Sequence, residues 1–129
     1  TKPSQTLIPK APGMKYTHYS PKADVILVQG NDLQKVQQKI QELVNDSTQK
    51  VGILATDQTK DSYNCEIVLS LGDRQNLEQI GANLFKHLRK FDFLGVEVVY
   101  SETVPQKGEG LAIMNRLQKA AGYKMITLS

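Results

Sequence analysis

Short, uninterrupted runs of apolar residues alternate along this chain with stretches whose apolar residues recur at helical spacing. The runs at 25–28 and 51–55 contain β-branched residues and have no polar side, a pattern typical of strands buried on both faces. Parallel strands need crossover connections, and helices supply them. The sequence therefore predicts an α/β fold, a Rossmann-like three-layer domain with a mostly parallel sheet of about 4–5 strands flanked by about three helices.

The same pattern gives the expected order of the elements. Asp32 and Asp73 can each cap a helix, and a third helix is expected at about 108–121. Cys65 lies just before the apolar run at 67–71, so we interpret it as a half-buried strand residue and not as a nucleophile. Strands are expected at 25–28, 51–55, 65–71 and 93–100, with a short final strand at 125–128.

The periodic pattern begins near residue 24, and the residues before it are polar and rich in proline. This contrast predicts an extended interdomain linker at 1–23 and a compact domain at 24–129, which is a length that suits one hydrophobic core. A linker at the start indicates a piece of a longer protein. The sequence has no apolar run long enough to cross a bilayer, so we expect a soluble, cytoplasmic protein with no membrane partner.

Motifs that would carry chemistry are scarce. A single cysteine and two histidines give no cluster with metal-ligand spacing, and neither common phosphate-binding glycine motif occurs. Gly108 and Gly110 could bring backbone N–H groups to an anion, but Glu109 between them is negative, which favours a tight turn before a helix. The net charge of +3 is spread among interleaved acidic and basic residues and identifies no partner.

The linker itself holds the densest group of functional side chains. Tyr16 and His18 point to one side of an extended segment, whereas Lys15 and Tyr19 point to the other. Such a strip could lie across a cleft and present phenol, imidazole and ammonium groups to a polar ligand. The residues alone favour a stiff spacer over this alternative.

The segment APGMKYTHYSP at 11–21 resembles the linker signature of the long-form L-threonylcarbamoyladenylate synthases, in the Sua/YrdC/YciO family. LRKFD at 88–92 with Gly95 and Val96, and GEGLAIMNRL at 108–117, are similar to the carboxyl-terminal domain of the same family. The resemblance runs from about residue 11 to 121.

The resemblance implies a parent enzyme that condenses L-threonine, bicarbonate and ATP, with magnesium, into threonylcarbamoyl-AMP and pyrophosphate for the N6-threonylcarbamoyladenosine modification of tRNA. The chemistry would belong to a YrdC-type amino-terminal domain, which this chain lacks, so the chain would have no catalytic residue, metal or cofactor of its own. Its partners would be that domain and the downstream tRNA-modifying machinery, with direct tRNA contact an open question.

The resemblance also assigns roles to particular residues. Lys15, Tyr16, His18 and Tyr19 would form a lid over the substrate site. An interdomain or ligand contact would involve Gly110, Asn115 and Arg116. The main alternative function is a free-standing Rossmann-like module that binds a small molecule or nucleotide, and an independent enzyme is a third.

Overall fold

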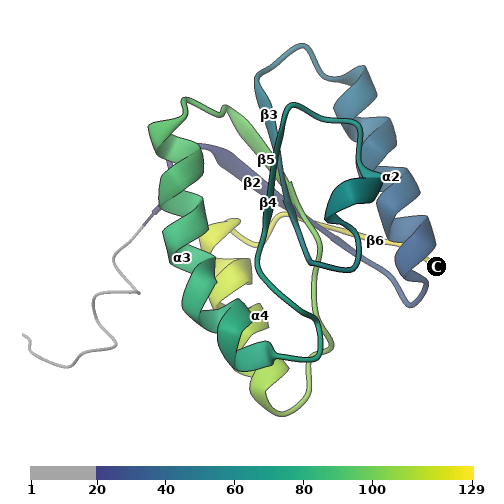
Figure 1. Ribbon diagram of the computed structural model, residues 1–129, viewed down its shortest axis with the longest axis vertical. Coiled ribbons are helices and arrows are strands. Elements are labelled where there is room, and N and C mark those ends of the chain that lie inside the picture. Colours follow the sequence, from purple (N-terminus) through teal and green to yellow (C-terminus); the bar gives the residue numbers. More distant parts are fainter. Residues whose placement is uncertain (1–19) are drawn as a thin grey trace, which may run out of the picture.

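The computed structural model describes residues 20–129, which form a five-stranded sheet with three α-helices in that range (Figure 1). All strand pairs are parallel, and the strand order is β4-β3-β5-β2-β6. The predicted α/β fold with its parallel sheet is confirmed. The elements in chain order are β2 (Asp24–Gln29), α2 (Leu33–Asp46), β3 (Val51–Ala55), the 3-10 turn η1 (Lys60–Ser62), β4 (Ile67–Ser70), α3 (Leu77–Phe93), β5 (Val98–Ser101), α4 (Glu109–Ala120) and β6 (Met125–Thr127).

Helices cover both faces of the sheet, which explains the apolar strands. Helix α2 packs on one face through Val36 and Ile40, and α3 and α4 lie together on the other face (Figure 1). Neighbouring residues of one strand enter different cores. In β3, for example, Leu54 packs under α3 and α4, whereas Ile53 packs under α2.

The parallel register brings the carboxyl ends of the strands to one edge of the sheet. Leu54 of β3 and Leu27 of β2 both pair with Ser101, the last residue of β5. The segments that follow these strands, 30–32, 56–59 and 102–108, therefore start side by side. This edge is where an open α/β sheet can gather polar side chains from segments that are distant in sequence.

Three local expectations were wrong. Helix α3 is capped by Asn76, whose side chain accepts from the Gln79 N–H, and Asp73 instead accepts from the Gln75 N–H in the preceding turn. The expected strand at 93–100 begins only at Val98, because α3 continues through Phe93 and ends where Gly95 takes a positive φ of 75°. The strand expected at 65–71 is shorter, so Cys65 lies before it, half-buried.

The beginning of the described chain is tied to the end of α3. The backbone N–H groups of Lys22 and Ala23 both donate to the Asp92 carboxylate, at 3.1 and 3.2 Å. Strand β2 starts at the next residue. The predicted linker boundary at 1–23 is untested, since most of that segment lies outside the described residues. Within 20–129, no helix combines the length and the apolar character that a bilayer crossing requires.

Candidate functional site

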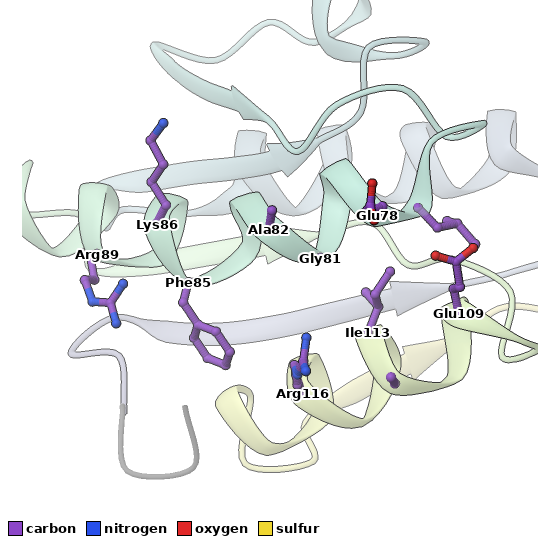
Figure 2. A pocket seen from close by; sticks show the side chains of 11 residues that line it. Glu78, Gly81, Ala82, Phe85, Lys86, Arg89, Glu109, Ile113 and Arg116 are labelled. Carbon is purple, nitrogen blue, oxygen red and sulfur yellow. The ribbon is translucent and has the colours of Figure 1, made fainter. Parts of the chain in front are cut away.

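A groove of about 460 Å³ runs between α3 and α4 on one face of the domain (Figure 2). The two helices follow parallel strands and run in the same direction, and Gly81 of α3 faces Ile113 of α4. Lys86 and Arg89 lie toward one end of the groove, and Glu78 and Glu109 toward the other (Figure 2). The groove is thus polarised along its length, which suits a partner surface of complementary charge.

Gly110, Asn115 and Arg116, the three residues predicted to make an interdomain or ligand contact, do not lie together in one site. Arg116 lines the groove from α4, with its guanidinium drawn toward Phe85 (Figure 2). Asn115 is exposed on the same helix but is not part of the groove wall. Gly110 is buried in the first turn of α4, and a Cβ there would lie 2.0 Å from the carbonyl oxygen of Pro105. Close packing of the 102–108 segment on α4 therefore explains Gly110 without a ligand.

The four predicted lid residues, Lys15, Tyr16, His18 and Tyr19, lie outside the described residues. Their role over a substrate site stays a prediction.

A buried polar cluster that was not predicted from the sequence lies at the carboxyl edge of the sheet. Its centre is the Glu102 carboxylate, which is 1% exposed and directly follows β5. One carboxylate oxygen accepts from the Thr56 hydroxyl at 3.0 Å and from Nη1 of Arg74 at 3.1 Å. The other accepts from the Thr59 hydroxyl at 2.6 Å and the Tyr63 hydroxyl at 2.5 Å. Four donors, one of which is the Arg74 cation, thus compensate the burial of this charge.

The cluster also fixes the positions of the groups around Glu102. Nη2 of Arg74 donates to the Thr103 carbonyl at 2.6 Å, so the guanidinium joins the segments that follow β4 and β5. Burial, and then the nearby Glu102 carboxylate, raise the pKa of Tyr63 far above its ordinary value. The phenol therefore acts as a hydrogen-bond donor and not as a base. A polar residue directly after each of two buried strands, Thr56 and Glu102, was the available sequence signal.

Elsewhere in the described part of the chain, the charged residues do not gather into a metal site. Among residues 20–129, no group of three or more histidine, cysteine, aspartate or glutamate side chains is placed to hold a metal ion. Hydrogen bonds from the Gln75 backbone N–H and the Gln58 side chain lower the pKa of Asp73, which keeps its loop-stabilising carboxylate ionised. That carboxylate orders the turn before α3.

Comparison with known families assigns the chain. The sequence model described as threonylcarbamoyl-AMP synthase, C-terminal domain, matches residues 1–122. The chain belongs to this family. The predicted resemblance is therefore confirmed, and it covers both the segment before β2 and most of the described domain.

Individual relatives of the family support the same assignment. The threonylcarbamoyl-AMP synthase of Pyrococcus abyssi is 48% identical over 120 residues, which are 91% of this chain and 33% of that protein. The crystal structure of P. abyssi Sua5 with L-threonine is similar at a TM-score of 0.77 and 45% identity, over 98% of this chain and 36% of that one. A structure of P. abyssi Sua5 with an adjacent histidine and tyrosine replaced by alanine gives a TM-score of 0.74 at 44% identity, over 84% of this chain and 30% of that one.

One solved relative consists of this domain alone. The crystal structure of the C-terminal Sua5 domain of a Pyrococcus horikoshii protein is similar at a TM-score of 0.66 and 41% identity, covering 84% of this chain and 100% of that one. By contrast, this chain spans about a third of the length of the curated synthases that it matches. The chain thus corresponds to the carboxyl-terminal part of the synthases.

Proposed function

We propose that this chain is the non-catalytic accessory domain, with its linker, of a synthase that converts L-threonine, bicarbonate and ATP into threonylcarbamoyl-AMP and pyrophosphate. The proposal rests on the part of the synthases that the chain matches. It matches the family's carboxyl-terminal domain and only about a third of the length of the curated synthases. A YrdC-type domain would supply the chemistry and would be the chief partner. The product would pass to the machinery that modifies adenosine in tRNA.

The linker acts as a lid over the substrate site in this proposal. A carbamate and an acyl-adenylate are both prone to hydrolysis, so a segment that excludes water would protect them. The chain contains one adjacent His–Tyr pair, His18 and Tyr19, and an adjacent histidine and tyrosine were the residues replaced in the solved P. abyssi variant. Lys15 and Tyr16 belong to the same strip. The described domain would hold the lid in place.

The groove between α3 and α4 is the proposed contact with the catalytic domain. Its support is the position of Arg116, which lies in the family-like segment 108–117 and lines a groove with basic and acidic ends (Figure 2). A complementary surface would fix the orientation of the domain through charge, an effect that contributes more to specificity than to affinity.

Pyrophosphate release tests the accessory role. The chain is incubated with L-threonine, bicarbonate and ATP, first alone and then with an added YrdC-type catalytic domain. We expect no turnover by the chain alone and faster turnover by the catalytic domain when the chain is present. Turnover by the chain alone would show an independent enzyme. Equal turnover by the catalytic domain with and without the chain would refute the accessory role.

Variants in the same assay test the two contacts separately. Tyr16→Ala and His18→Ala should lower synthesis and raise the fraction of ATP lost to hydrolysis, because an open site admits water. Arg116→Glu should raise the concentration of chain needed for half-maximal stimulation, whereas Lys119→Glu, the same charge reversal at an exposed position of α4 outside the groove, should not. Equal effects of the two reversals would exclude a specific role for the groove.

A further inference from the structure

The carboxyl edge of the sheet contains a second cavity, distinct from the groove between α3 and α4. It has a volume of about 350 Å³ and lies between the segments that follow β2 and β5, two neighbouring strands. The chain leaves β2 toward α2 on one face of the sheet and leaves β5 toward α4 on the opposite face (Figure 1). In open α/β sheets, ligands bind in the crevice that such diverging connections create.

One wall of this cavity includes Thr103, a buried residue whose hydroxyl lacks a partner among residues 20–129. Thr103 is 9% exposed, and its side-chain hydroxyl makes no hydrogen bond to any other residue in the described part of the chain. Its backbone carbonyl, by contrast, accepts from Arg74. Buried polar groups are nearly always hydrogen-bonded, and an unpaired one is costly. This hydroxyl therefore needs a partner, and Thr103 lines a cavity that could hold one.

Arg74 presents fixed donors in the same wall. Its Nη1 donates to both Thr56 and Glu102, and its Nη2 donates to the Thr103 carbonyl. A guanidinium has five N–H groups, and the Nε–H of Arg74 has no partner among residues 20–129. The ion pair with Glu102 holds the guanidinium in one orientation. The guanidinium is thus already held in place beside the cavity, which reduces the entropy lost when a ligand binds its remaining donors.

The remaining wall indicates the size and charge of the ligand. Val36 and Pro105 are apolar, and Asn31 contributes an exposed side-chain amide that bonds to no other described residue. Because Glu102 balances the charge of Arg74 and the Asp32 carboxylate caps the amino terminus of α2 beside the cavity, the wall carries no excess of positive charge. One negative charge matches this field better than a polyphosphate.

We propose that this crevice binds a small monocarboxylate with a compact apolar body, its carboxylate on Arg74 and the Thr103 hydroxyl and its body against Val36 and Pro105. The volume is near the lower end for small-molecule sites and suits a metabolite. The proposal does not depend on the synthase assignment. The accessory domain would have a ligand site of its own.

Amide chemical shifts of the 129-residue chain test the proposal without any catalytic measurement. Isobutyrate is the probe, isobutyramide is its uncharged match, and inorganic phosphate is the competing oxyanion. We expect saturable shifts at Gly30, Asn31 and Thr103 with isobutyrate, and an affinity about 10-fold above that of isobutyramide. No saturation with isobutyrate, equal binding of the amide, or tighter binding of phosphate would each overturn the monocarboxylate assignment.

Two variants separate a specific site from loose association. Thr103→Val removes a hydroxyl without a described partner while keeping the shape, so the fold should be as stable as before and isobutyrate binding should weaken several-fold. Arg74→Lys keeps a cation beside Glu102 but removes the planar guanidinium with its Nε–H, and should weaken binding further. Arg89→Lys, in the other groove, is the control and should bind normally. Unchanged binding by Thr103→Val and Arg74→Lys would refute the proposal.

Discussion

Replacing Glu102 by glutamine tests the buried cluster that joins three segments at the carboxyl edge of the sheet. The carboxylate accepts four hydrogen bonds while only 1% exposed. Glutamine keeps one acceptor oxygen but turns an NH₂ group toward the hydroxyls of Thr59 and Tyr63, which then have to rotate and accept. It also removes the counter-ion of Arg74. Glu102→Gln should therefore weaken the cluster without creating a large cavity.

The magnitude follows from the burial of the two charges. Hydrogen bonds to a charged group contribute about 1.5–3 kcal/mol each and neutral ones about 0.5–1.5 kcal/mol, whereas breaking a fully buried ion pair costs about 3–5 kcal/mol. The Arg74 side chain is 21% exposed and can partly rehydrate, so the lower part of that range applies. We expect Glu102→Gln to lower the free energy of unfolding by about 2–4 kcal/mol, a large share of the usual 5–15 kcal/mol.

Urea unfolding at neutral pH measures this loss, with Glu66→Gln as the matched control. Glu66 is exposed and bonds to no other described residue, so its replacement should change stability by less than about 0.5 kcal/mol. A thermodynamic cycle with Arg74→Met then isolates the pair, and the double variant should lose about 1–3 kcal/mol less than the sum of the single variants. Additive losses, or a Glu102→Gln variant as stable as Glu66→Gln, would show that the cluster does not hold this edge together.

Two further predictions concern Tyr63 and Gly110. Since folding raises the pKa of Tyr63 above its ordinary value of 10.0, its stabilising contribution is complete below that pH and declines as the pH rises above it. Tyr63 should therefore not contribute to the phenolate absorbance when the folded chain is titrated to alkaline pH, so the Tyr63→Phe variant should give the same signal as the original chain. A loss of one fifth of the signal, one of five equal tyrosine contributions, would contradict the raised pKa. Gly110→Ala should destabilise by about 3 kcal/mol or more, because its Cβ would lie 2.0 Å from the Pro105 oxygen. Gly81→Ala, whose Cβ would make an ordinary 3.6 Å contact with Ile113, should stabilise α3 by about 0.5–1 kcal/mol, and equal unfolding midpoints for the two variants would refute the packing argument.

The fold could be predicted because burial on both faces leaves a strong local signature. The apolar runs at 25–28 and 51–55 nearly coincide with β2 and β3. The amphipathic patterns predicted the three helices. The errors arose where side-chain and backbone groups compete locally. Asp73 and Asn76 can both cap a helix, and the choice depends on which of them has its oxygen near the first free N–H groups.

The candidate sites were harder to predict because they depend on strand order, which periodicity does not contain. Arg74 and Glu102 are 28 residues apart, and they meet because the segments after β4 and β5 converge beside β3. The crevice next to them exists because β2 and β5 are neighbours although β3 and β4 separate them in sequence. Polar residues directly after buried strands do mark the edge where such groups can meet. Thr56, Glu102 and Thr103 can therefore be predicted from the sequence to lie at this edge. The strand order is needed to identify which of them face the same cavity.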